Sequence, residues 1–156
     1  MEKESLASER RYSVLEIEEK HLSDIAELER LCFAHPWTES GLRAFLTDGY
    51  LGFAAVDNES GRCVAYAGMT CASDEGNITN VAVHPDFRRM GLASSVIARL
   101  LASARSAGIK NVFLEVRESN SGARALYEGL GFAVCGRRKN FYRTPTEDAL
   151  IMTKTL

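Results

Sequence analysis

The segment RRMGLASS, residues 88–95, places two arginines and a glycine directly before an amphipathic helix. The first N–H groups of a helix have no intrahelical acceptor, and the helix dipole adds partial positive charge there. Gly91 would let a ligand approach the backbone without a Cβ, and Arg88 and Arg89 can donate charged hydrogen bonds to phosphate oxygens. The segment fits a phosphate site, and a solvated basic turn explains these eight residues equally well. Neither G-x-x-x-x-G-K-[ST] nor G-x-G-x-x-G occurs in the chain.

A glutamate and a tyrosine are candidate proton carriers. In NVFLEVR, residues 111–117, the apolar residues alternate along a strand, so Glu115 lies on the face opposite to them. Tyr127 lies in the helical segment ARALYEGL, where we expect it at the edge of a buried stripe formed by Ala123, Leu126 and Leu130. From the residues alone, Glu115 reads as a surface carboxylate and Tyr127 as a core aromatic.

The periodicity predicts the elements that must position these residues. Period-two patterns and turn residues indicate strands over residues 12–17, 50–57, 62–72, 77–83, 111–117, 132–143 and 148–154. Helical spacing indicates helices over 21–33, 39–48 and 92–107, and a last one from 121 to the glycines at 129 and 131. Thr38 is a plausible N-cap for the second helix, and residues 58–61 form a hairpin turn. The order predicts an α/β domain with a mixed sheet.

Composition excludes several classes of protein. The chain of 156 residues carries a net charge of −2 and has a pI near 6.0, which gives no general attraction to nucleic acid. We expect residues 1–11 to form a disordered or loosely ordered arm and residues 12–156 to form a single domain. Neither a signal peptide nor a membrane span is predicted, so we expect a cytoplasmic protein that binds no membrane.

The cysteines and histidines do not form a metal motif. Their spacings are irregular and no C-x-x-C pair occurs, so no metal is expected. Each cysteine lies in or beside an apolar segment, which predicts reduced, buried thiols. His84, next to Pro85, is expected to be a solvated turn residue.

Several of these motifs together resemble the GNAT superfamily of N-acetyltransferases. R-R-M-G-L-A fits its acyl-CoA pyrophosphate loop, and LEVRESNSGARALYEGLGF resembles its second cofactor segment. The resemblance implies a mixed, mostly antiparallel sheet of about seven strands with helices on both faces. Ala93 stands where many members have a second glycine, and Phe141 precedes Tyr142 where tyrosine pairs are common.

The resemblance also implies roles for individual residues. Glu115 would act as general base and Tyr127 as general acid. The strand at 81–83 would splay from its neighbour and pair with pantetheine amides, and Asn120 would contact the pantetheine arm besides capping a helix. The residues implied for acetyl-CoA are Val81, Ala82, Val83, Arg88, Arg89, Met90, Gly91, Leu92, Ala93, Ser94 and Asn120.

Two further segments, HPWTES and NFYRTPTEDALIM, resemble the N-terminal acetyltransferases of ribosomal proteins. Trp37 and Tyr142 within them would wall the peptide entrance, although both could simply cover the core. The implied acceptor is the N-terminal alanine of the eighteenth small-subunit ribosomal protein. Acetylation of a small-molecule amine and non-catalytic acyl-CoA binding stay open as alternatives.

Overall fold

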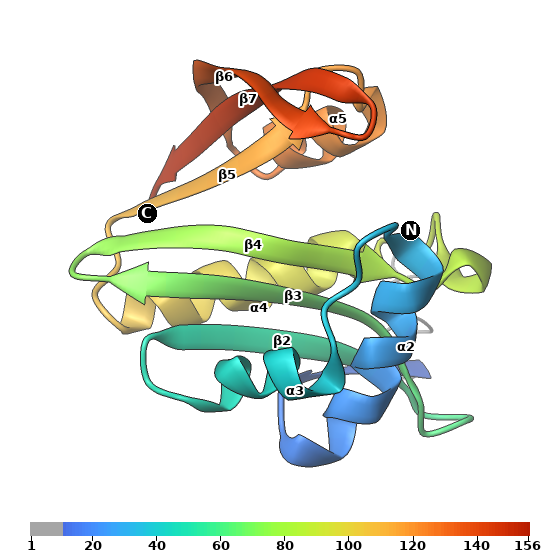
Figure 1. The fold of residues 1–156 in the computed structure, drawn as a ribbon. Helices are drawn as coiled ribbons and strands as arrows, with labels where there is room; N and C mark the ends of the chain where they lie inside the picture. The colour runs from blue at the N-terminus through green and yellow to red at the C-terminus, as the bar shows by residue number, and fades with distance from the viewer. Residues whose placement is uncertain (1–10) are drawn as a thin grey trace.

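A computed structural model describes residues 11–156, so the arm expected over residues 1–11 lies almost entirely outside the described residues. The fold is built on one seven-stranded sheet with the order β1-β2-β3-β4-β5-β7-β6 (Figure 1). Only the β4–β5 pair is parallel. The mixed, mostly antiparallel sheet is therefore confirmed. Its strands are β1 (Tyr12–Glu16), β2 (Tyr50–Asp57), β3 (Cys63–Ala72), β4 (Glu75–Val83), β5 (Asn111–Arg117), β6 (Ala133–Arg143) and β7 (Thr146–Thr155).

Helices cover both faces of the sheet. On one face, α2 (Leu22–Cys32) packs against β3 and β4, flanked by the turn η1 (Glu19–His21) and followed by α3 (Glu39–Leu42) and η2 (Arg43–Leu46) (Figure 1). On the other face, α4 (Leu92–Ser106) packs against β2 to β4, and α5 (Ser121–Gly129) follows β5. Each face has its own hydrophobic cluster, because apolar side chains alternate along the strands. We refer to the two sides as the α2 face and the α4 face.

The sheet opens between β4 and β5. The two strands pair only from Glu75 and Asn111 to Ile78 and Leu114, and beyond this point they diverge (Figure 1). The divergence begins at a β-bulge: Ile78 pairs with Met69 and Asn80 with Gly68, so Thr79 between them has no register partner on β3. A bulge bends the strand and re-aims the side chains that follow it. The remainder of β4 consequently has no neighbouring strand on its β5 side, as the resemblance implied.

Two local predictions need correction. The helix expected over 39–48 is a four-residue α-helix followed by a 3-10 turn, although Thr38 does cap it by accepting from the Gly41 N–H at 3.0 Å. The cysteines were expected to be buried, but Cys63 is the only buried one among them. Cys135 is exposed because it lies on β6, the edge strand of the sheet.

Candidate active site

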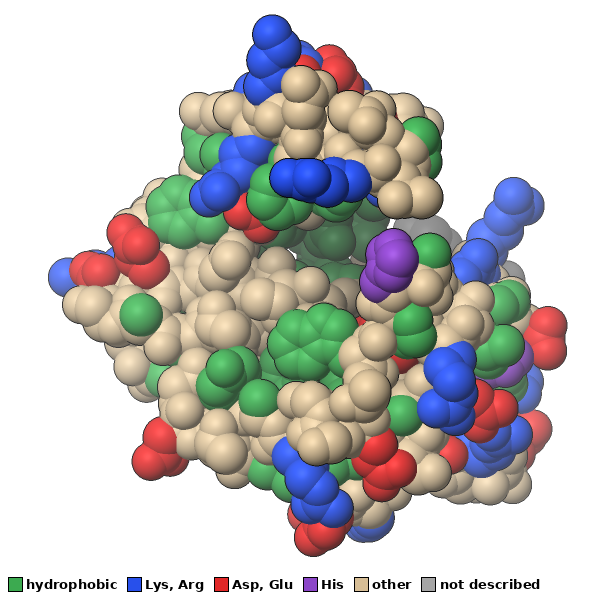
Figure 2. All heavy atoms as spheres, viewed as in Figure 1, with side chains coloured by type: hydrophobic (Ala, Val, Ile, Leu, Met, Phe, Trp, Pro, Cys, Tyr) green, Lys and Arg blue, Asp and Glu red, His purple; other side chains and the backbone are tan. Residues whose placement is uncertain are grey.

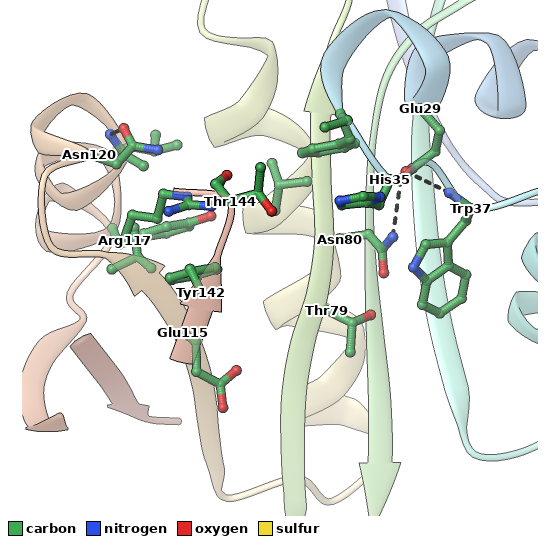
Figure 3. Close-up of a pocket in the computed structure, with 17 residues that line it drawn as sticks. Glu29, His35, Trp37, Thr79, Asn80, Glu115, Arg117, Asn120, Tyr142 and Thr144 are labelled. Atoms are coloured by element: carbon green, nitrogen blue, oxygen red, sulfur yellow. Dashed lines mark hydrogen bonds between the residues drawn. The ribbon is translucent and has the colours of Figure 1, made fainter. Parts of the chain in front are cut away.

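A cleft of about 520 Å³ opens where β4 and β5 separate. Figure 2 shows it as a hollow beneath the part of the molecule formed by β5 to β7 and α5, with Lys and Arg side chains on its upper rim. Its walls come from α2 and the loop after it, β4, β5, α5 and β6 (Figure 3). The cleft brings together six of the residues predicted from the sequence, namely Trp37, Val81, Glu115, Asn120, Tyr127 and Tyr142.

Glu115 lies on the strand face that the sequence predicts. Its neighbours Leu114 and Val116 are buried in the cluster on the α4 face, so the carboxylate emerges on the α2 face. The side chain is 22% exposed, and its Oε1 lies 3.5 Å from Nε of Arg138 on β6. Glu115 therefore reaches the cleft as a partly exposed carboxylate beside an arginine.

Tyr127 is buried and not at the edge of a stripe, which corrects the prediction for this helix. Among the residues of α5, Tyr127 alone is buried, whereas Ala123 and Leu126 are half-buried. Its ring packs edge-on against Phe132, with centroids 5.9 Å apart, in the cluster on the α4 face. Burial, followed by the nearby Tyr142, raises the pKa of Tyr127 to about 12.

Glu115 and Tyr127 thus reach the same cleft from opposite faces of the sheet. The carboxylate belongs to the α2 face and the phenol to the core under α5. They meet because the sheet is open between β4 and β5. A thioester and an amine could therefore enter from different sides and react in the gap.

The predicted phosphate loop lies beyond the cleft, at the end of β4. It follows the turn η3 (Pro85–Phe87), and Arg89 and Gly91 have left-handed φ angles of +64° and +74°. The Ser95 N–H donates to the Gly91 carbonyl at 3.1 Å, so the N–H groups of residues 92–94 precede the first helical hydrogen bond. These free donors at a helix start support the anion site that the sequence predicts.

The two arginines of the loop are not equivalent. Both side chains are exposed, but Arg88 Nε donates to the Val83 carbonyl at 3.3 Å and Nη2 to Cys32 Sγ at 3.6 Å, whereas Arg89 has no hydrogen-bond partner among residues 11–156. Met90 Sδ accepts a hydrogen bond from the Tyr12 hydroxyl at 3.2 Å. Arg88 would have to release its present partners to reach a phosphate, so Arg89 is the better placed of the two.

Aromatic side chains form part of the wall on the α2 face. Trp37 stacks on Phe45, with ring centroids 5.7 Å apart and planes at 20°. Across the cleft, Tyr142 lies beneath the Arg117 guanidinium, 4.3 Å from its ring centroid. Burial, followed by the Glu115 carboxylate, raises the pKa of Tyr142. Both predicted wall residues therefore line the cleft, one on each side of it (Figure 3).

Sequence reasoning missed a buried polar cluster at the cleft. Glu29 of α2 is 1% exposed and accepts hydrogen bonds from the Tyr66 hydroxyl, from Asn80 Nδ2 at 3.1 Å and from the Trp37 N–H at 3.1 Å. A signal was present: Glu29 lies four residues after the apolar Ile25, on the buried side of the predicted helix. A carboxylate on such a stripe points to buried donors elsewhere in the chain.

It also missed Arg117, which fixes the turn between β6 and β7. Its guanidinium donates to the carbonyls of Thr144 and Pro145, each at 3.0 Å, and pairs with Glu147 at 3.3 Å. These bonds fix the turn directly after β6, next to Tyr142, which lines the cleft.

Within residues 11–156, no group of three or more His, Cys, Asp and Glu side chains is arranged to hold a metal ion. No helix in this range is long and apolar enough to cross a membrane.

Comparison with known proteins relates the chain to acetyltransferases. The acetyltransferase (GNAT) family matches residues 22–132. The [ribosomal protein bS18]-alanine N-acetyltransferase of Escherichia coli is 34% identical over 142 residues, which are 90% of this chain and 95% of that protein. Its counterpart in Haemophilus influenzae is 30% identical over 142 residues, covering 89% of this chain and 95% of that protein.

The fold agrees with these sequence matches. The crystal structure of the ribosomal-protein-S18-alanine N-acetyltransferase from Escherichia coli superposes with a TM-score of 0.84 at 33% identity, covering 92% of this chain and 93% of that one. The chain belongs to the GNAT family of acetyltransferases.

Proposed function

We propose that the chain transfers an acetyl group from acetyl-CoA to the N-terminal α-amine of a protein, and that this acceptor is the N-terminal alanine of ribosomal protein bS18. The observation that carries the proposal is the meeting of Glu115 and Tyr127 from opposite faces in one open cleft. Identity of 34% to a relative named for this reaction, across nearly the whole of both chains, supports the choice of acceptor.

Acetyl-CoA would enter from the α4 face. Backbone N–H groups of residues 88–94 would hold its pyrophosphate. Beyond Ile78 the edge of β4 that faces β5 has no partner strand, so the backbone of Val81–Val83 can pair with pantetheine amides once Arg88 and Cys32 release the Val83 carbonyl. Asn120 Oδ1 accepts the Ala123 N–H at 3.1 Å to cap α5, which leaves the Nδ2 group to donate to the same arm.

The acceptor would enter from the α2 face, between Trp37 and Tyr142. Its nitrogen attacks the thioester carbon, and a proton passes from the amine to Glu115 as the C–N bond forms. The C–S bond then breaks, and Tyr127 donates its proton to the departing sulfur. Tyr127 regains a proton from solvent, and Glu115 releases to solvent the proton that it took from the amine. With a pKa of about 12, Tyr127 is protonated at neutral pH, as an acid must be.

An N-terminal α-amine is a suitable acceptor for a site whose base is a single partly exposed carboxylate, Glu115. Its pKa of about 7.7 to 8.0 leaves roughly 10 to 20% neutral at pH 7, compared with about 0.04% for a lysine. A single base is therefore sufficient for an N-terminus, whereas a lysine would need further help to lose its proton.

The test is acetylation of synthetic peptides followed by mass spectrometry. One peptide carries the N-terminal residues of bS18 with a free amine and an internal lysine, and the matched control carries a blocked N-terminus. The proposal expects one acetyl group on the free N-terminus and none on the blocked peptide. Acetylation of the lysine in both peptides, or of a polyamine in place of either peptide, would contradict it.

A further inference from the structure

The buried cluster around Glu29 links three elements of the molecule. The carboxylate sits on α2, and its donors come from β3 through Tyr66, from β4 through Asn80 and from the loop after α2 through the Trp37 N–H. A buried carboxylate is costly unless donors surround it, and replacing such a group by apolar side chains often stabilises a protein. Glu29, Asn80 and Trp37 also line the cleft, which points to a role of the cluster in binding a ligand there (Figure 3).

The hydrogen bonds of Glu29 divide between its two oxygens. Oε1 accepts from Tyr66 and Asn80, whereas Oε2 accepts only the Trp37 N–H among the described residues. The loop that carries Trp37 is therefore tied to the core by a hydrogen bond at the residue that lines the cleft. Stacking on Phe45 then fixes the plane of the indole.

The same carboxylate also sets the orientation of Asn80. Both Glu29 oxygens accept hydrogen bonds, so Asn80 turns Nδ2 toward Glu29 and Oδ1 away from it (Figure 3). That oxygen is buried and has no hydrogen-bond partner among residues 11–156. An unsatisfied buried acceptor is unfavourable, so an N–H group that reached it from a bound molecule would be favoured.

The bulge at Thr79 explains why Asn80 is on this face. Ile78, before the bulge, packs in the cluster on the α4 face, and strict alternation would place Asn80 beside it. The extra residue shifts the alternation, so Asn80 faces α2 and Glu29. The bulge at Thr79 therefore has two effects. It opens the sheet where acetyl-CoA would bind, and it turns the Asn80 amide toward the α2 face, from which the acceptor would enter.

We propose that Glu29 is a positioning residue for the acceptor. Through the Trp37 backbone and the Asn80 amide it holds the wall against which the N-terminal peptide binds, and Asn80 Oδ1 accepts an N–H from that peptide. The inference rests on the proposed function, because it takes the ligand on this face to be a peptide.

The test compares Glu29→Gln with Asp57→Asn, a matched exchange of a buried carboxylate for its amide. Asp57 is 3% exposed and accepts from the Ser60 hydroxyl at 2.9 Å and the Glu59 N–H at 3.2 Å, away from the cleft. Glu29→Gln should raise KM for the peptide by roughly 10- to 100-fold and leave KM for acetyl-CoA within about twofold. Asp57→Asn should lower the melting temperature and leave both constants within about twofold.

A second readout does not depend on activity. Trp37 is the one tryptophan of the sequence, so tryptophan fluorescence, excited selectively over that of the tyrosines, reports on this wall alone. Acrylamide quenching should increase in Glu29→Gln and stay unchanged in Asp57→Asn. If wild-type protein acetylates no N-terminal peptide, the proposed function fails, and the quenching comparison still decides whether Glu29 holds Trp37.

Three results would overturn the inference: an unchanged peptide KM in Glu29→Gln, unchanged quenching in that variant, or an equal rise of KM in Asp57→Asn. Should Glu29→Gln fail to fold, Asn80→Ala takes its place, since it keeps the bond between Glu29 and Trp37. It should raise the peptide KM without changing the quenching, and an unchanged KM would overturn the inference equally.

Discussion

The two sides of the cleft are built on different principles. On the α4 face, the groups that we propose to bind acetyl-CoA are mostly backbone groups, from the free edge of β4 and the start of α4. On the α2 face, the wall consists of side chains brought together from distant segments, such as Glu29, Asn80 and Tyr142. A backbone site tolerates most substitutions and depends on chain conformation, whereas a side-chain site depends on each residue.

This difference predicts separate kinetic signatures. Substitutions on the α4 face should change the constants for acetyl-CoA, and those on the α2 face should change the constants for the peptide. Where the two sides meet, substitution should lower turnover and leave both substrates able to bind.

The largest effect is expected from Glu115→Gln, which keeps the shape of the side chain and removes the base. We expect kcat at neutral pH to fall by roughly 10² to 10⁴ and to recover partly as pH rises past the pKa of the amine, because the amine then arrives neutral. Steady-state rates from pH 6 to 9 measure this, and calorimetry should show unchanged acetyl-CoA binding. Full activity across that range would mean that the base is another group or solvent.

Tyr127→Phe should have the next largest effect, a loss of kcat of about 10²-fold, with a smaller loss for an acyl donor whose thiol is more acidic. The pH dependence of the wild-type rate tests whether the pKa of Tyr127 is raised. Because burial raises the pKa of Tyr127 to about 12, the acid stays protonated and the wild-type rate should not decline between pH 8 and 10.5. A decline near pH 10 would contradict the raised pKa of Tyr127. Equal losses with both donors would show that Tyr127 only positions the thioester.

The two sides of the cleft also differ in how much of each the sequence predicts. The strands and helices follow from periodicity, and Glu115 was assigned to the correct face because alternation along β5 is strict. The phosphate loop is contiguous, so its glycine and its place before a helix were visible in eight residues. The position of this loop before a helix therefore follows from a local pattern, whereas the free edge of β4 was implied only by the resemblance to the GNAT superfamily.

The remainder depended on contacts between distant segments. Helical spacing predicts that Ala123, Leu126 and Leu130 are buried and that Tyr127 lies at the edge of their stripe. In the structure, the Tyr127 ring instead packs in the core beside Phe132. The bulge at Thr79 exists only relative to β3, and two of the three donors to Glu29, Tyr66 and Asn80, lie 37 and 51 residues further along the chain. No single segment contains that information.

On the α4 face, Gly91→Val should weaken acetyl-CoA binding by about tenfold or more, and Arg89→Ala should weaken it less. At a φ of +74° a β-branched residue is strained, which costs about 1–2 kcal/mol and moves the N–H groups that follow. Titration calorimetry measures both variants. The matched control is Gly61→Val, since Gly61 has the same φ of +74° and equally open surroundings in the turn after β2. It should lose comparable stability and bind acetyl-CoA normally, and equal, near-zero losses of binding in Gly91→Val and Arg89→Ala would exclude the backbone site.

The smallest effect is expected from Tyr142→Ala on the α2 face. It is also the sharpest test of whether the acetyl-CoA side and the peptide side of the cleft are separate. Loss of the ring beneath Arg117 removes one wall of the peptide entrance, so KM for the peptide should rise by about five- to tenfold while KM for acetyl-CoA stays nearly constant. Phe141→Ala is the matched control: Phe141 packs edge-on against Tyr142 at 5.1 Å, yet it is 45% exposed and does not line the cleft. That variant should leave both constants within about twofold. A change in the acetyl-CoA constant for Tyr142→Ala, with the peptide constant unchanged, would mean that Tyr142 belongs to the cofactor side and that the two walls are not separate.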